Sequence, residues 1–143
     1  MIVAQNRTMT ARAFTLIELI VVIVVLAILS AVAIPKYIDY SAKAKESACR
    51  GILGNVRTAI ANYYANAAVN GTAAYPTLVQ LQTNGTVMQD TVPANPYNNS
   101  AVIAAATWAA TPPTSGANGW NYDAATGKFW ANTNTASVGE NAW

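Results

Sequence analysis

The chain has 143 residues, of which 53% are hydrophobic and only 10% are charged, with a formal net charge of +2. It contains no histidine and one cysteine, which excludes Ser-His-Asp and Cys-His catalysis, histidine-based zinc sites and an internal disulfide. Arg7 and Arg12 account for the net charge of +2, so the side chains of the remaining residues sum to zero charge. Nucleic acid is therefore excluded as the main partner, because phosphate binding depends on clustered Lys and Arg.

Residues 1–13 form a polar leader without an acidic residue. An ordinary secretory signal is cut after its hydrophobic segment. Here the polar stretch stops directly before that segment, and Ala13 supplies a small residue on the near side. Cleavage between Ala13 and Phe14 would retain the apolar segment and create an α-amino group on Phe14. The alternative is a tag or an ordinary positively charged flank of a membrane anchor.

Residues 14–35 form an apolar run that carries one carboxylate, Glu18. A helix over this run covers roughly 30 Å, about the thickness of the hydrocarbon core of a bilayer. An unpaired carboxylate near the edge of such a span costs on the order of 2–3 kcal/mol, so Glu18 needs a cation. The Phe14 amine of a neighbouring subunit, charged at neutral pH, would supply it and select one axial stagger between subunits. The alternative is an acid tolerated near the lipid interface.

The helix is predicted to continue beyond Pro35 to about Ala68. Proline removes one backbone hydrogen bond and its ring clashes with the carbonyl of Ala31, which predicts a kink or a locally melted turn. Beyond Pro35 the pattern becomes amphipathic, with apolar residues recurring at helical spacing at Ala42, Cys49, Ile52, Val56, Ile60 and Tyr63. The cysteine on this face is interpreted as a small core residue.

The last third of the chain carries the strand signals. A short helix from Thr77 through Leu81 is predicted before it. One strand is expected around Val102 and Ile103 or near Trp108. The clearest hairpin has a five-residue turn over 123–127, and places Trp130 opposite Trp120.

The start of the apolar run resembles the class III prepilin signature of type IV pilins and type II secretion pseudopilins. The resemblance covers about residues 11–65 and rests on the sequence FTLIE, the Val/Ile/Leu run that follows it, and Pro35, Tyr37 and Tyr40. It implies that a prepilin peptidase cuts between Ala13 and Phe14 and methylates the Phe14 amine, and that Glu18 sets the register between subunits. The family usually has Gly where this chain has Ala13.

The resemblance implies an α+β fold, the pilin lollipop. A long kinked N-terminal helix, with a transmembrane half and an amphipathic half, packs in that fold on a small C-terminal antiparallel β-sheet. The corresponding division is a cleaved leader over 1–13, a transmembrane and assembly helix over 14–35, and a globular domain over 36–143. Within the domain the helix continues to about residue 68, and a variable loop (69–100) precedes the sheet region (101–143).

The function implied by the resemblance is that of a non-enzymatic filament subunit. The first hypothesis is a type II secretion pseudopilin that drives protein export, and the alternative is the major pilin of a surface type IV pilus serving adhesion, motility or DNA uptake. Many type IV pilins clasp their C-terminal region with a disulfide, so the lone Cys49 favours a pseudopilin or a disulfide-free pilin. A membrane-tethered binding or enzymatic domain is the alternative of another class.

The implied partners are further copies of the chain in a helical filament, the prepilin peptidase, an inner-membrane assembly platform with its ATPase, and a secretin. The implied location is the bacterial inner membrane, crossed once with the C-terminal domain periplasmic, before extraction into a periplasmic or cell-surface filament. No cofactor is expected apart from calcium, which major pseudopilins bind near the C-terminus. Its candidate ligands are Asp90, Asp123 and Glu140, although no tight acidic spacing links them. The alternative is a turn role for Asp123 and solvent exposure for the other two.

Overall fold

The computed structural model describes residues 14–143 and confirms the α+β class, with a long N-terminal helix and a small sheet. The chain divides between Tyr40 and Ser41 into two compact units, which are described separately. Helix α1 (Leu16–Val69) contributes residues to both units. The other elements, all in the second unit, are α2 (Leu78–Gln82), β1 (Ile103–Ala105), β2 (Trp120–Asp123), β3 (Lys128–Ala131) and the 3-10 helix η1 (Glu140–Ala142).

The part of α1 in the first unit is rich in Val, Ile and Leu. The β-branched Val and Ile favour strands in many proteins, but a segment that lies in lipid must satisfy its backbone hydrogen bonds internally, as a helix does. The helix is continuous from Leu16 to Val69 and includes Pro35. The melted turn predicted at Pro35 is therefore wrong, because the loss of one hydrogen bond does not interrupt the ladder on either side. The kink stays a prediction.

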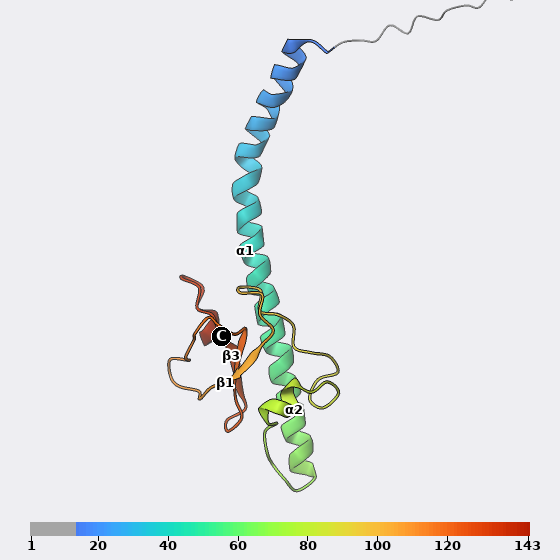
Figure 1. Cartoon of the computed structure of the whole chain (residues 1–143), viewed down its shortest axis with the longest axis vertical. Helices are drawn as coiled ribbons and strands as arrows, with labels where there is room; N and C mark the ends of the chain where they lie inside the picture. The colour runs from blue at the N-terminus through green and yellow to red at the C-terminus, as the bar shows by residue number, and fades with distance from the viewer. Residues whose placement is uncertain (1–13) are drawn as a thin grey trace, which may run out of the picture. The chain divides into compact units, whose positions relative to one another are not determined.

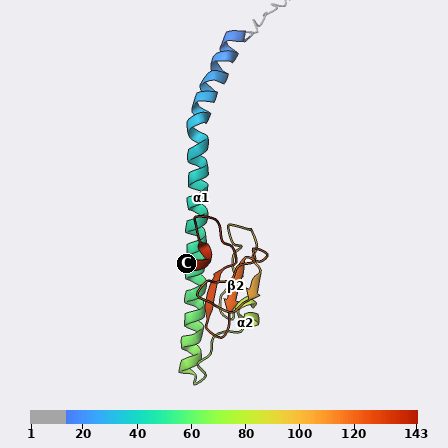
Figure 2. The same cartoon turned by 90° about the vertical axis from the view of Figure 1, so that its left-hand side faces the viewer.

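In the second unit, one stripe of α1 packs on one face of the sheet. The stripe consists of Cys49, Leu53, Val56 and Ile60, which are all at most 2% exposed. In Figures 1 and 2 the three strands lie alongside the green part of α1, and α2 lies near the end of the helix. The sheet contributes large side chains to the same core, namely Trp120, Tyr122 and Phe129. Burial of these apolar side chains is the main favourable contribution to the folding of this unit.

The sheet is mixed and not purely antiparallel. Its strand order is β1-β2-β3, and β2 pairs with β3 in the antiparallel sense. However, β1 pairs with β2 in parallel, with Ile103 opposite Trp120. The connection over residues 106–119 is long enough to return the chain to the end of the sheet where β1 began, which a short hairpin cannot do. The prediction of an antiparallel sheet is thus correct for one strand pair and wrong for the other.

The register of the β2–β3 hairpin also differs from the prediction. Asp123 pairs with Lys128, so the turn contains four residues and Trp130 lies opposite Asn121, not opposite Trp120. Because side chains alternate between the faces of a strand, the change of one residue places the two tryptophans on opposite faces. Trp120 stacks on Phe129 with the ring centroids 5.5 Å apart, on the face that packs against α1.

The second face of the sheet is covered by the connection between β1 and β2. The rings of Trp108 and Trp130 meet edge to face with their centroids 5.2 Å apart. The carbonyl oxygen of Pro113 accepts hydrogen bonds from Trp130 Nε1 at 3.0 Å and from Asn121 Nδ2 at 2.9 Å. Both faces of the sheet are therefore covered at β2 and β3, where every residue except Lys128 is buried.

The start of β2 depends on a glycine. A Cβ atom at Gly119 would lie 1.8 Å from the carbonyl oxygen of Ser100, which is a backbone atom and cannot rotate away. Gly119 also donates its N–H to Val102 at 3.1 Å, and its carbonyl accepts from the buried Asn95 side chain at 2.8 Å. The close approach therefore fixes the segment before β1 against β2.

We expect Gly119→Ala to lower the free energy of unfolding by about 2–3 kcal/mol, because the added methyl group forces backbone apart. The measurement is chemical denaturation of the full chain in detergent micelles, followed by tryptophan fluorescence. Gly54→Ala is the matched control. Gly54 is exposed on α1, and a Cβ atom added there would have no neighbour within 4 Å, so this variant should be as stable as the parent or up to about 1 kcal/mol more stable. Equal stability of the two variants would contradict the proposed clash.

Candidate assembly site at the start of the N-terminal helix

Thr15 and Glu18 form a reciprocal cap at the start of α1. The backbone N–H of Thr15 donates to Glu18 Oε2 at 2.8 Å, and its hydroxyl donates to the same oxygen at 2.9 Å. In return, the backbone N–H of Glu18 donates to Thr15 Oγ1 at 3.3 Å. This arrangement is a capping box, and its T-x-x-E spacing is the sequence signal from which the role of Thr15 could have been predicted. The carboxylate also lies at the positive end of the helix dipole.

The cap compensates Glu18 only in part. In residues 14–143, the Oε1 atom of Glu18 accepts no hydrogen bond, and no cation forms an ion pair with the carboxylate. Phe14, which cleavage would make the first residue, precedes the helix and is 86% exposed. Ala13 lies outside the described residues, so cleavage and methylation at this junction stay predictions. The site thus presents one free carboxylate oxygen close to the residue that would carry the new amine.

Large apolar side chains surround this carboxylate and remain exposed along the helix. From Phe14 to Ile38 their exposed fractions range from 41% at Ile20 to 86% at Phe14. In the described part of the chain, α1 is the one helix long and apolar enough to cross a membrane, judged by length and composition. No part of its apolar window is buried by other described residues. This surface therefore requires lipid or protein to cover it.

The three candidate calcium ligands do not form one site. Asp123 is buried at the end of β2, where Oδ2 accepts the N–H of Trp108 at 3.0 Å and Oδ1 accepts the N–H of Ala125 at 2.9 Å. These hydrogen bonds, first that from Trp108, lower the pKa of Asp123. Asp90 is exposed. Among residues 14–143 there is no group of three or more His, Cys, Asp or Glu side chains that could hold a metal ion.

Glu140 is fully buried, so the alternative of solvent exposure is wrong for this residue. Both of its carboxylate oxygens accept the N–H of Thr135 at 2.9 Å, and Oε1 also accepts the Thr135 hydroxyl at 2.7 Å. Burial alone would raise the pKa of Glu140, but the hydrogen bonds, led by that from the Thr135 side chain, outweigh it and lower the pKa. The polar sequence of residues 132–142 did not predict this burial, because the burial depends on how that segment folds back onto the domain.

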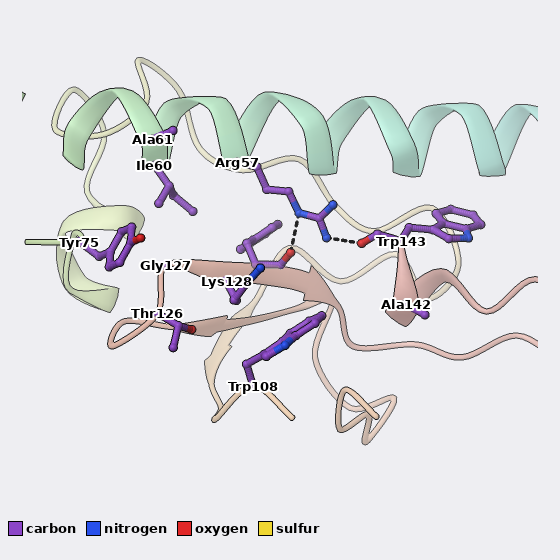
Figure 3. A pocket seen from close by; sticks show the side chains of 11 residues that line it. Arg57, Ile60, Ala61, Tyr75, Trp108, Thr126, Gly127, Lys128, Ala142 and Trp143 are labelled. Atoms are coloured by element: carbon purple, nitrogen blue, oxygen red, sulfur yellow. Dashed lines mark hydrogen bonds between the residues drawn. The ribbon is translucent and has the colours of Figure 1, made fainter. Parts of the chain in front are cut away.

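Arg57 attaches the C-terminal segment to α1, a role that the amphipathic pattern did not indicate. Its Nε atom donates to the carbonyl oxygen of Phe129 at 2.9 Å, and Nη2 donates to the backbone oxygen of Trp143. Figure 3 shows both bonds beside the pocket that Arg57 and Trp143 help to line. The guanidinium of Arg50 lies over the Trp143 ring, 3.9 Å from its centroid. Burial lowers the pKa of Arg57. The tail therefore folds back onto the helix within the second unit.

Cys49 is a core residue, as predicted. It is completely buried in the stripe of α1 that packs on the sheet. Burial, assisted by the negative charge of Glu140, raises the pKa of its thiol to about 11. The thiol is therefore protonated and unreactive at neutral pH.

Together, the exposed apolar helix, the capped acid at its start and the small domain on its second half define an N-terminally anchored α+β protein. The sequence matches a family model described as the prokaryotic N-terminal methylation motif over residues 8–34. The chain is therefore similar, over part of its length, to type IV pilin-like proteins.

Three curated proteins are similar to part of the chain. Fimbrial protein EcpC of Eikenella corrodens is 40% identical over 58 residues, which are 41% of this chain and 38% of that protein. Type IV major pilin protein PilE1 of Neisseria gonorrhoeae is 44% identical over 55 residues, 38% of this chain and 33% of that protein. Type IV major fimbrial protein FimA of Dichelobacter nodosus is 45% identical over 49 residues, 34% and 31% respectively. The chain thus spans about a third of the length of these relatives. No solved structure matches it.

The burial of Glu140 predicts a pH-dependent contribution to stability. Its folded pKa lies below the ordinary value of 4.5, so its ionised form stabilises the fold above that pH and the contribution is lost as the pH falls through the folded pKa. We expect Glu140→Gln to lower the free energy of unfolding at pH 7 by about 1–3 kcal/mol, and to reduce the loss of stability on acidification. Denaturation curves between neutral pH and pH 3 measure both effects. Asp90→Asn, which changes an exposed acid, is the control, and equal curves for the two variants would refute the role of Glu140.

Proposed function

We propose that this chain is a structural subunit of a type IV pilin-like filament, processed between Ala13 and Phe14, methylated on Phe14 and polymerised from the inner membrane. The observation that carries the proposal is the half-satisfied Glu18 carboxylate at the start of an exposed apolar helix, within the methylation motif of residues 8–34. The carboxylate has one oxygen held by Thr15 and one oxygen free for a partner.

An assembly role for Glu18 follows from the cost of an uncompensated charge in an apolar environment. The Phe14 amine created by cleavage is positive at neutral pH. When a second copy is shifted along the filament axis, its amine can reach the free Glu18 oxygen, and the pair is then tolerable where either charge alone is costly. The Val, Ile and Leu surface permits many axial shifts, whereas the ion pair selects one. The Thr15 hydrogen bonds orient the carboxylate before that contact forms.

The remaining features of the proposal follow from this role. The filament is a homo-oligomer, and its assembly requires a prepilin peptidase, an inner-membrane platform and an ATPase, with a secretin for passage through the outer membrane. The domain over residues 36–143 lies in the periplasm before extraction. The proposal assigns no enzymatic activity and no cofactor. Calcium is not part of the proposal, since Asp123 already accepts hydrogen bonds from the N–H groups of Trp108 and Ala125, and Glu140 from that of Thr135.

We expect Glu18→Ala to leave membrane insertion and leader cleavage largely intact while reducing filament assembly at least about tenfold, because it removes the one buried ion pair that selects the stagger. Thr15→Val is the matched control. It removes the hydroxyl of the cap, which costs the helix start about 1 kcal/mol, but it keeps the carboxylate. Mass spectrometry of the processed protein and electron microscopy of filaments are the measurements. Normal filaments from Glu18→Ala would refute the proposal, and an equal loss from Thr15→Val would reduce Glu18 to a helix cap.

Between the two filament classes, the relatives favour a surface pilus. Two of the similar proteins are named as type IV major pilin or major fimbrial proteins, and a third as a fimbrial protein. The absence of a second cysteine favours a pseudopilin or a disulfide-free pilin, and does not by itself distinguish these. We therefore place the major pilin of a surface pilus first and the type II secretion pseudopilin second.

Mechanical shearing distinguishes the two classes. A surface pilin is expected to appear in the sheared extracellular fraction as long fibres that contain the processed chain, whereas a pseudopilin stays with the cell envelope. Immunoblotting of the two fractions and microscopy of the sheared material provide the measurement, with an inner-membrane protein as the control for lysis. Retention of the chain in the envelope, together with loss of protein export in a deletion strain, would reverse the order proposed here.

A further inference from the structure

Residues 14–143 contain three copies of the motif Asn-x-Thr or Asn-x-Ser, which is the acceptor motif for N-linked sugars. The copies begin at Asn70, Asn84 and Asn98, and none has proline in the middle position. Asn and Gly also favour turns, so the same sequences can be explained by turn chemistry alone. The hydrogen bonds of each asparagine side chain show where that explanation is sufficient.

Asn98 is committed to the loop that contains it. Its side-chain nitrogen donates to the carbonyl oxygens of Gly116 at 3.2 Å and Asn118 at 2.8 Å. Its Oδ1 atom accepts the N–H of Ser100 at 3.1 Å, which forms an Asx turn. The residue is half-buried. Turn chemistry therefore explains this copy of the motif, and the amide nitrogen is not accessible in the folded chain.

Asn70 is committed to the end of α1. Its side-chain nitrogen donates at 2.9 Å to the carbonyl oxygen four residues earlier. The rest of the motif also caps the helix, because the N–H of Gly71 donates to Ala68 at 3.1 Å. The N–H of Thr72 donates to Ala67 at 2.9 Å. This copy of the motif can become extended only if the last turn of α1 unwinds.

Asn84 has no structural role of this kind. The residue is exposed, and its side chain forms no hydrogen bond with any of residues 14–143. The turn is made by the backbone instead. The N–H of Gly85 donates to the carbonyl oxygen of Met88 at 2.7 Å, and Gly85 has a φ of 79°, which glycine adopts without strain. Turn chemistry therefore explains Gly85 but not the asparagine before it.

The third residue of this motif, Thr86, is also exposed, and within residues 14–143 its hydroxyl has no hydrogen-bond partner. The next two residues, Val87 and Met88, are half-buried and pack against the hydrophobic core. The amide and the hydroxyl are thus presented on an ordered base. Opening the turn breaks only the backbone bonds donated by Gly85 and Thr86, and no side-chain bond of the motif.

We propose that Asn84 is the acceptor of an N-linked sugar, and that Asn70 and Asn98 are not modified. The proposal rests on the proposed function, which exports this domain, because the motif marks surface loops of exported proteins. In the reaction a bond forms between Asn84 Nδ2 and the anomeric carbon of the sugar. The bond from that carbon to the phosphate of a lipid-linked sugar diphosphate breaks, the lipid diphosphate leaves, and the amide nitrogen loses one proton.

The test is mass spectrometry of the full chain, purified in detergent from the organism that encodes it. Chymotryptic cleavage after Leu81 and Tyr97 releases a peptide over 82–97, which contains Asn84 and neither of the other two motifs. We expect this peptide to be heavier by at least one sugar residue, with the added mass on Asn84. Unmodified Asn84 overturns the proposal, as does a sugar on Asn70 or Asn98. The mass of the N-terminal peptide reports leader cleavage separately, so a processed chain with unmodified Asn84 contradicts the glycosylation and not the filament role.

Thr86→Val is the informative variant, because it keeps Asn84 and removes only the hydroxyl that the motif requires. We expect the added mass to be lost, with the unfolding curve unchanged because this hydroxyl has no partner within residues 14–143. Thr72→Val makes the same change in the motif at Asn70 and is the matched control, which should keep the added mass on Asn84. Retention of that mass in Thr86→Val would overturn the proposal.

Discussion

The pairing of Asp123 with Lys128 is the constraint on which the structure of residues 41–143 depends. It fixes the register of the hairpin, and side-chain alternation then places Trp120 and Phe129 on the face that meets the buried stripe of α1. A shift of β3 by one residue would turn Trp130 toward the helix in place of Phe129. Asp123 supports this register through its side chain, which accepts hydrogen bonds from the backbone on both sides of β2.

A second set of interactions holds the loops to that sheet. Indole, phenol and amide donors of the strands reach the carbonyl oxygens of prolines, whose fixed φ angles make the loops stiff. The bonds are Trp120 Nε1 to Pro93, Tyr122 OH to Pro76, and Asn121 Nδ2 and Trp130 Nε1 to Pro113. In the part of the chain that the structure describes, no buried side-chain N or O atom lacks a hydrogen-bond partner. The loops are thus attached to the sheet by directed hydrogen bonds, in a chain whose one cysteine is free and buried.

The helix α1 presents two different surfaces because the pattern of apolar residues changes along its sequence. Residues 19–35 are apolar on every side apart from Ser30 and remain exposed, which suits an element that requires lipid or neighbouring copies. From Ser41 onward one narrow stripe is buried and the opposite face is polar or small. The Thr15–Glu18 cap at the start of the apolar part holds one carboxylate oxygen of Glu18, and the other accepts no hydrogen bond from residues 14–143.

The sequence alone determined the class of fold and the apolar helix, because length and hydrophobic period are local properties of the chain. It also singled out Glu18 as the one charge in the apolar run, and the assembly role of that residue stays a prediction. It also placed the short helix after Thr77 and the first strand near Ile103. It could not determine the parallel pairing of β1, the hairpin register or the burial of Glu140, since each depends on contacts between segments that are separated along the chain. The contact of Arg57 with Phe129 and Trp143 is of the same kind. Only tertiary packing brings such distant residues together, and nothing in the pattern around any of them specifies the others.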